Sequence, residues 1–116
     1  MAAIFGIVAV GMAQKPADMA AEKKKLTEIA AQQSKAKAAY VKNKKSPAAK
    51  TTYVKWTMTL AENTMYAKYL SSKEKYPKAL RSYREVLTVD PTNKEAKQWV
   101  NMIESIYKQS GKPIPR

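Results

Sequence analysis

The sequence predicts an all-α protein of antiparallel helical hairpins, with about four helices in a short stack. Three observations carry this prediction. Small and large apolar residues are spaced as in a helical hairpin over residues 66–93. Apolar residues recur three and four positions apart over residues 94–109, which is the period of one helix face. Proline stands at positions 47 and 91, between the predicted helical segments.

The first predicted helix covers about residues 19–41 and has a thin, alanine-rich apolar face. The residues expected on that face are Leu26, Ile29, Ala30, Tyr40 and Val41. Alanine and lysine favour helix formation but bury little apolar area, so this helix is expected to depend on a partner surface.

The second helix is predicted to start at Pro47 and to run to about Ser71. Ser46 is a good N-cap, and proline suits the first helical position because the N–H that it lacks would be unpaired there in any case. The residues expected to form the buried stripe of this helix are Tyr53, Trp56, Leu60, Ala67 and Leu70.

The third helix is predicted to begin near Tyr76 and to end near Val89. Pro91 cannot continue a helix, and its ring pushes the preceding residue toward extended backbone. Thr92 or Asn93 then caps the last helix.

That last helix is predicted over residues 94–109, and Gly111 is a stop signal just beyond it. The residues expected on its buried face are Ala96, Trp99, Val100, Ile103, Ile106 and Tyr107. Its end is followed by a short tail that contains two prolines.

The residues at key packing positions between 66 and 93 are Ala67, Leu70, Tyr76, Ala79, Tyr83 and Pro91. This pattern resembles one nearly complete tetratricopeptide repeat (TPR), which has a period of roughly 34 residues. The tryptophan and leucine places of the family fall on Asn63 and Tyr66, so the front edge departs from the pattern. The resemblance covers about the last half of the chain. It implies a short solenoid closed by a capping helix, with a concave groove of the kind that holds a peptide.

The chain of 116 residues has the length of one domain, with five predicted segments. They are an apolar N-terminal segment (1–14), a lysine- and alanine-rich helix with the start of the second helix (15–59), a TPR-like repeat (60–93), a capping helix (94–110) and an extended tail (111–116).

The apolar run at residues 2–12 is shorter than the roughly 20 residues that span a bilayer, so no transmembrane span is expected. It has the size of a secretory signal core, with small residues before a cut ahead of Gln14, although no basic residue precedes it. A signal remnant and a retained assembly segment both remain open. The expected location is secreted, periplasmic or at the cell surface, with the cytoplasm as the alternative.

The composition argues against catalysis. The sequence has neither histidine nor cysteine, which removes the commonest general base, the commonest zinc ligand and every thiolate. Its three glycines are too widely separated for a phosphate-binding loop. The nine acidic residues are interpreted as solvated charges on helix faces. We therefore predict a non-enzymatic protein with no catalytic residues, no metal and no cofactor.

The formal net charge of +13 favours an anionic partner. Lysine carries nearly all of it, and no nucleic-acid-binding motif accompanies it, so specific nucleic-acid binding is not expected. The densest clusters, at residues 23–25 and 42–45, are candidates for contact with an anionic surface or polymer. A solvated basic face is the alternative.

The leading functional hypothesis is a TPR-like interaction or structural protein that assembles with copies of itself into an oligomer or filament, because one repeat leaves apolar faces uncovered. The candidate contacts are Ile4, Phe5, Ile7, Val8, Val10, Trp99 and Ile114. One alternative is a monomeric adaptor whose groove binds a peptide carboxylate through Tyr66, Tyr69, Lys73, Arg81 and Arg84. A second alternative is a basic surface protein that binds anionic polymers.

Overall fold

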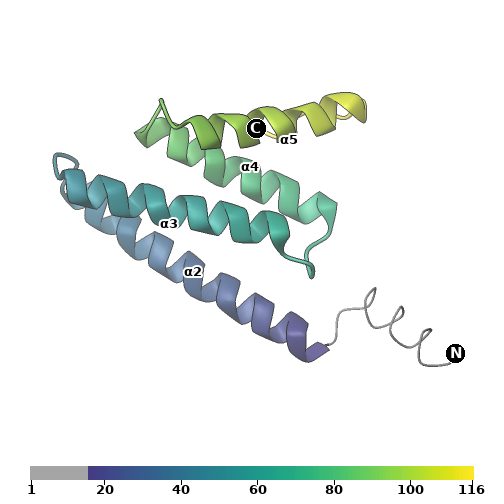
Figure 1. Ribbon diagram of the computed structural model, residues 1–116, viewed down its shortest axis with the longest axis horizontal. Helices are drawn as coiled ribbons and strands as arrows, with labels where there is room; N and C mark the ends of the chain where they lie inside the picture. Colours follow the sequence, from purple (N-terminus) through teal and green to yellow (C-terminus); the bar gives the residue numbers. More distant parts are fainter. Residues whose placement is uncertain (1–15) are drawn as a thin grey trace, which may run out of the picture.

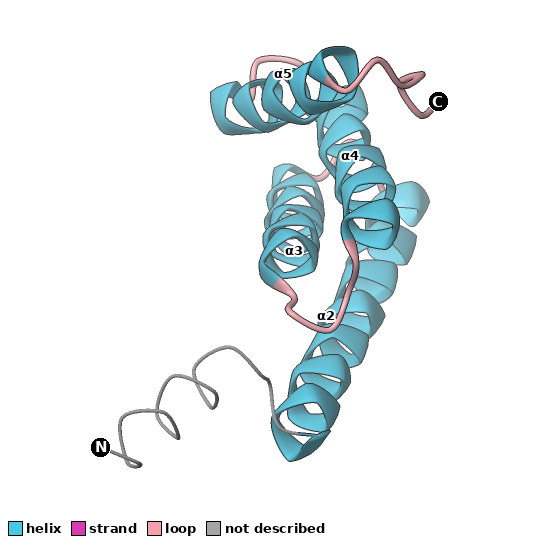
Figure 2. Cartoon of the chain, turned by 90° about the vertical axis from the view of Figure 1, so that its right-hand side faces the viewer, coloured by secondary structure: helices cyan, strands magenta, loops and turns pink. Residues whose placement is uncertain are grey.

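The computed structural model of the protein describes residues 16–116. Those residues form four α-helices and no strand, which confirms the all-α prediction. The helices are α2 (Pro16–Lys42), α3 (Pro47–Tyr66), α4 (Ser72–Val89) and α5 (Lys94–Gln109). They are stacked in chain order, with each one packed on the next (Figure 1). Short loops join them (Figure 2).

The observed helix starts follow local capping chemistry. The Ser46 hydroxyl accepts the N–H of Ala49 at 3.1 Å at the start of α3. The side chain of Asn93 accepts the N–H of Ala96 at 2.9 Å, so Asn93 and not Thr92 caps α5. The last helix has the predicted bounds.

The predicted boundary between the second and third helices is wrong at both ends. Helix α3 ends at Tyr66, and Ala67 is its C-cap with extended backbone at φ −67° and ψ 117°. Helix α4 begins at Ser72 because Ser71 and Glu74 form a capping box. The start that was predicted near Tyr76 is therefore one turn late.

The core lies between α3, α4 and α5. Its fully buried small residues are one alanine on each of these helices, namely Ala61, Ala79 and Ala96, each 0% exposed. Alanine lets three helix backbones approach one another closely. The larger buried residues of the same cluster are Leu80, Tyr83, Val86, Val100 and Ile103.

The buried faces of α2 and α3 differ from the predicted ones. The buried residues of α3 are Tyr53, Thr57, Ala61 and Thr64, while Trp56 and Leu60 are only partly buried. Those of α2 are Ile29, Gln33 and Ala36, while Val41 is 56% exposed. Polar residues therefore fill places for which the sequence predicted apolar ones.

Helix α2 is held by a polar cluster around Glu85 of α4. Gln33 donates to Glu85 at 3.0 Å and to the Thr57 hydroxyl at 3.2 Å. The Tyr53 hydroxyl also donates to Glu85, and the Lys37 ammonium lies 3.5 Å from the same carboxylate. One carboxylate thus joins α2, α3 and α4, which compensates for the thin apolar face of α2.

The C-terminal tail is tied back onto the helices. Arg84 donates to the carbonyl of Pro115 at 2.6 Å, and its guanidinium also pairs with Glu104 at 3.0 Å. Ile114 packs against the core cluster. None of the helices in residues 16–116 is long and apolar enough to cross a membrane.

Candidate functional site

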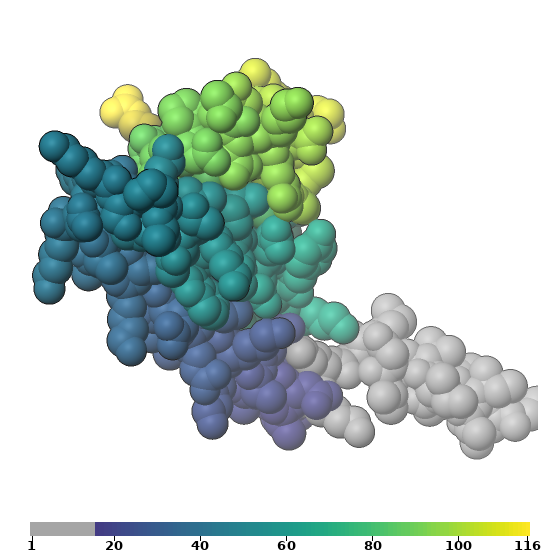
Figure 3. Space-filling model, turned by 60° about the vertical axis from the view of Figure 1, so that its left-hand side comes forward, coloured from purple at the N-terminus to yellow at the C-terminus, as the bar shows by residue number. Residues whose placement is uncertain are grey.

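Five residues form a cluster across α3, α4 and α5 that we call the α3–α5 cage: Glu62, Tyr66, Tyr83, Glu95 and Trp99. Helices α3 and α5 each contribute a glutamate and, four residues later, an aromatic residue. Residues four apart on a helix share one face, so the two helices present matching pairs to each other. Figure 3 shows α2, α3 and α5 in succession over one face of the molecule.

The aromatic side of the cage is built on Trp99. Its ring stacks on Tyr83 with centroids 5.5 Å apart and an interplanar angle of 3°. Tyr66 meets Trp99 edge-on, at 6.2 Å and 87°. Tyr83 is 0% exposed, whereas Tyr66 is 68% exposed. Tyr83 therefore lies on the buried side of the cage, and Tyr66 lies on its solvent-facing side.

The acidic side of the cage brings two carboxylates together. Burial, a hydrogen bond to Glu95 and the negative charge of Glu95 raise the pKa of Glu62 above its ordinary value. Burial and the charges of Glu62 and Glu95 also raise the pKa of Tyr83 well above 10.0. The Tyr83 hydroxyl is buried and has no hydrogen-bond partner within residues 16–116.

This arrangement suits a cation. The two carboxylates offer acceptors, and aromatic faces attract positive charge. The described residues contain no group of three or more acidic side chains that could hold a metal ion. An organic cation fits these oxygen atoms better than a metal ion does, because divalent cations require more oxygen ligands than this cage supplies.

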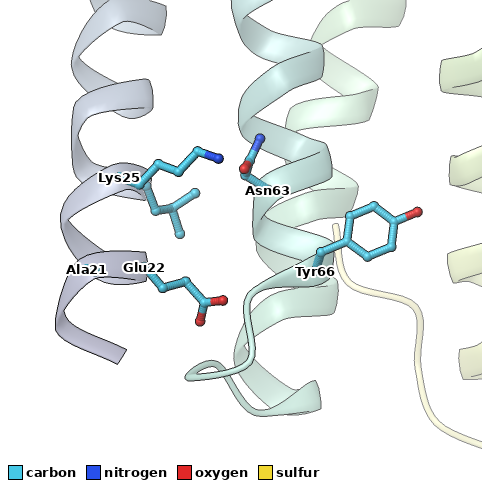
Figure 4. Close-up of a pocket in the computed structure, with 6 residues that line it drawn as sticks. Ala21, Glu22, Lys25, Asn63 and Tyr66 are labelled. Carbon is cyan, nitrogen blue, oxygen red and sulfur yellow. The ribbon is translucent and has the colours of Figure 1, made fainter. Parts of the chain in front are cut away.

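A hollow of about 320 Å³ lies beside the cage, between α2 and α3 (Figure 4). Lys25 extends into it from α2 toward Asn63, and Glu22 extends toward the α3–α4 loop, while the Tyr66 ring points away from α2. A second hollow of about 450 Å³ shares Lys25 and Asn63 with the first and reaches Trp56. We call the two together the α2–α3 groove.

The structure does not bring the five predicted groove residues together. Tyr66 belongs to the cage, while Tyr69 lies in the α3–α4 loop, where Glu22 accepts its N–H at 3.1 Å. Lys73 lines a different hollow, of about 580 Å³, beside the C-terminal tail. Arg81 is exposed on α4.

Arg84 follows Tyr83 on α4, and adjacent residues on a helix point about 100° apart. Tyr83 turns inward, so Arg84 meets Glu104 and Pro115 instead. Tyr66, Lys73 and Arg84 therefore make their contacts in three different parts of the described structure.

The other candidate contacts have mixed outcomes. Trp99 and Ile114 both pack within the molecule, the former on Tyr83. The five apolar candidates near the N-terminus lie outside the described residues: Ile4, Phe5, Ile7, Val8 and Val10. The lysines at 23–25 and at 42, 44 and 45 are all exposed.

Sequence reasoning missed Glu62 and Glu95, because every acid was interpreted as a solvated charge. The spacing of glutamate and aromatic residue, repeated as 62/66 and 95/99, was the available signal. Comparison with known proteins gave no match to any family model, curated protein or solved structure. The resemblance to TPR repeats thus stays a hypothesis, and the candidate site depends on its geometry alone.

Proposed function

We propose that this chain is a non-enzymatic, TPR-like scaffold protein that associates with further copies of itself. The observation that carries the proposal is the placement of exposed apolar side chains on the two end helices of the described stack. Met19 and Val41 on α2 and Met102 on α5 are 38%, 56% and 45% exposed. Exposed apolar side chains of this size are suited to contact with another protein surface.

The packing order supports the same proposal. Helix α2 packs chiefly on α3, and α5 packs chiefly on α4. Each end helix thus has a side on which another helix can be added, as in helical repeat arrays. Addition of α2 of one copy beside α5 of the next is a head-to-tail contact, which gives a ring when the rotation closes and a filament when it does not.

A non-enzymatic role is supported by the composition. The sequence offers no histidine or cysteine. Action outside the cytoplasm remains a prediction from the apolar N-terminal segment.

The test is the molar mass of the full chain in solution, measured by light scattering and sedimentation over a wide range of concentration. We expect mass to rise with concentration. The variant Val41→Glu should weaken association, because it places a charge on an exposed apolar position of α2. The matched control is Ala39→Glu, which adds the same charge to an exposed position on the opposite side of the helix. A monomer at every concentration would refute the proposal.

A second candidate function is peptide binding in the α2–α3 groove, favoured by the two adjoining hollows that meet at Lys25 and Asn63. A peptide library panned against the protein tests it. Bound sequences should be lost with Thr59→Arg, which fills the groove, and retained with Lys97→Glu, which changes an exposed position on α5.

A further inference from the structure

A hollow of about 580 Å³ lies between the start of α4, the end of α5 and the C-terminal tail, and we call it the tail hollow. The two helix ends lie at the same end of the molecule, where the helices diverge (Figure 1). The apolar and aromatic residues that line the hollow are Tyr76, Pro77, Ile106, Tyr107, Pro113 and Pro115. It is larger than either hollow of the α2–α3 groove, and its volume is within the range of about 300–1,000 Å³ that is usual for small-molecule sites.

The tail that forms one wall of this hollow is held in place at several points. Gly111, at φ +69°, turns the chain at the end of α5. Beyond it, Ile114 packs against the core cluster, and Arg84 donates to the carbonyl of Pro115 at 2.6 Å. A tail without such contacts is usually poorly ordered. Because this tail is already fixed, a ligand does not have to order it on binding.

The charged side chains at the tail hollow are all positive. Its lining within residues 16–116 includes Lys73 and Lys112 and no acidic residue. Neither lysine forms an ion pair within that part of the chain. The acids nearest to them in sequence are engaged elsewhere, Glu74 in the capping box of α4 and Glu104 with Arg84. An anionic group in the hollow therefore meets two ammonium groups and no carboxylate.

The dimensions of the tail hollow favour a small molecule over a peptide. The hollow contacts α4 over residues 72–77 and α5 over residues 106–110. At a rise of about 1.5 Å per residue, these stretches of helix are roughly 7.5 Å and 6 Å long. An extended peptide advances about 3.3 Å per residue, so only about two of its residues would lie between the two helices. A flat molecule with a single ring system makes better use of this space.

We propose that the tail hollow binds a small aromatic carboxylate. The rings of Tyr76 and Tyr107, both partly buried, offer flat apolar surfaces to an aromatic body. The carboxylate accepts hydrogen bonds from the ammonium groups of Lys73 and Lys112. Apolar walls with a few polar groups that fix orientation are the usual composition of a ligand site. The hollow lies within one chain, so this binding does not depend on self-association.

The first experiment is a titration of the isotope-labelled full chain with cinnamate, followed by two-dimensional amide NMR. Saturable shifts should be confined to the amides around the hollow, including Lys73, Ser110, Gly111 and Lys112. Cinnamamide has the same shape without the charge and should bind about three- to tenfold more weakly, whereas acetate, which has no ring, should give no saturable shift. Shifts spread over the basic surface, or equal responses to cinnamate and acetate, would overturn the proposal.

Two pairs of lysine variants separate the site from the net charge of the chain. Lys73→Gln/Lys112→Gln should weaken cinnamate binding by about three- to tenfold, as expected of two exposed ion pairs, and leave cinnamamide binding unchanged. The matched control is Lys50→Gln/Lys97→Gln, which removes the same charge at exposed positions outside the hollow and should not change binding. Equal weakening by both pairs would mean that cinnamate responds to net charge alone.

A third pair of variants blocks the hollow directly. Ser72→Phe places a ring at an exposed position that lines the hollow, and it should abolish cinnamate binding. Ser34→Phe adds the same ring to an exposed position on α2 and should leave binding unchanged. Unchanged helix content by circular dichroism shows that each variant has folded. Undiminished binding by folded Ser72→Phe would place the ligand elsewhere and overturn the proposal.

Discussion

Replacement of Tyr83 by phenylalanine should stabilise the protein, whereas the same replacement at Tyr53 should destabilise it. Both rings are buried, with Tyr83 at 0% and Tyr53 at 4% exposure. The Tyr83 hydroxyl has no hydrogen-bond partner in the described part of the chain, while the Tyr53 hydroxyl donates to the carboxylate of Glu85. The substitutions remove the same atom, so their difference isolates the effect of the hydrogen bond.

The magnitudes follow from the partners. A buried polar group without a hydrogen bond costs about 1–3 kcal/mol, and Tyr83→Phe keeps the stack on Trp99, so we expect a gain of about 1 kcal/mol. A hydrogen bond to a charged group contributes about 1.5–3 kcal/mol. Because Gln33 still donates to Glu85 after Tyr53→Phe, we expect a loss near the lower end, about 1.5 kcal/mol.

The assay is urea unfolding of both variants at neutral pH, followed by circular dichroism and checked by thermal melting. The two variants should differ by roughly 2.5 kcal/mol, which corresponds to roughly 10 °C or more between their melting temperatures. A Tyr83→Phe variant less stable than the wild type would show that its hydroxyl is satisfied in solution. Equal effects at both positions would contradict the assignment of Glu85 as the stabilising partner of Tyr53.

Three further substitutions probe other features. Ala79→Leu should cost about 1–3 kcal/mol in thermal unfolding, because three helices meet at this 0% exposed site, whereas exposed Ala39→Leu should not. Gly111→Ala should cost about 1 kcal/mol in urea unfolding, since φ there is +69°. Burial, a hydrogen bond to Glu95 and the charge of Glu95 raise the pKa of Glu62 above its ordinary value of 4.5. Around these pH values the folded chain binds more protons than the unfolded chain. The free energy of unfolding should therefore fall as pH rises from 4.5 through the raised pKa of Glu62. Glu62→Gln should remove this loss in urea unfolding measured across pH, and an unchanged pH profile would contradict the pairing of these two carboxyls.

The sequence was sufficient for α5, whose bounds are those predicted. Its cap, its stop signal and its helical period all agree, so local signals determine the element without help from tertiary contacts. The end of α3 is different, because residues 67–70 contain no glycine or proline to stop the helix. There the carboxylate of Glu22 accepts the N–H groups of Lys68 and Tyr69 at 2.8 and 3.1 Å, which offers the backbone an alternative to helix. A residue 46 positions away cannot be recognised as a cap from local sequence.

The buried face of α3 could not be predicted from hydropathy for a related reason. Thr57 and Thr64 are 1% and 4% exposed, although neither was among the residues expected in the buried stripe. Their hydroxyls donate to carbonyls one turn earlier at 2.8 and 2.7 Å, so neither needs water. Because their hydroxyls are hydrogen-bonded, these threonines pack like small apolar residues. The buried stripe therefore contains Thr57 and Thr64, whereas the prediction had placed Trp56 and Leu60 in it.

Two of the cage residues share that difficulty, because a glutamate in a lysine-rich chain resembles any solvated charge until the fold places a second carboxylate beside it. The net charge also bears on how copies meet. With a net charge of +13, whole molecules repel one another, and this repulsion acts over a Debye length of about 10 Å at 0.1 M salt. The proposed contact between exposed apolar side chains of α2 and α5 carries no charge, so salt does not screen it. Added salt should therefore promote association by weakening the repulsion. An association that only falls as salt is added from very low concentration would mean that attraction between the lysines and scattered acids, and not the apolar contact, joins the copies.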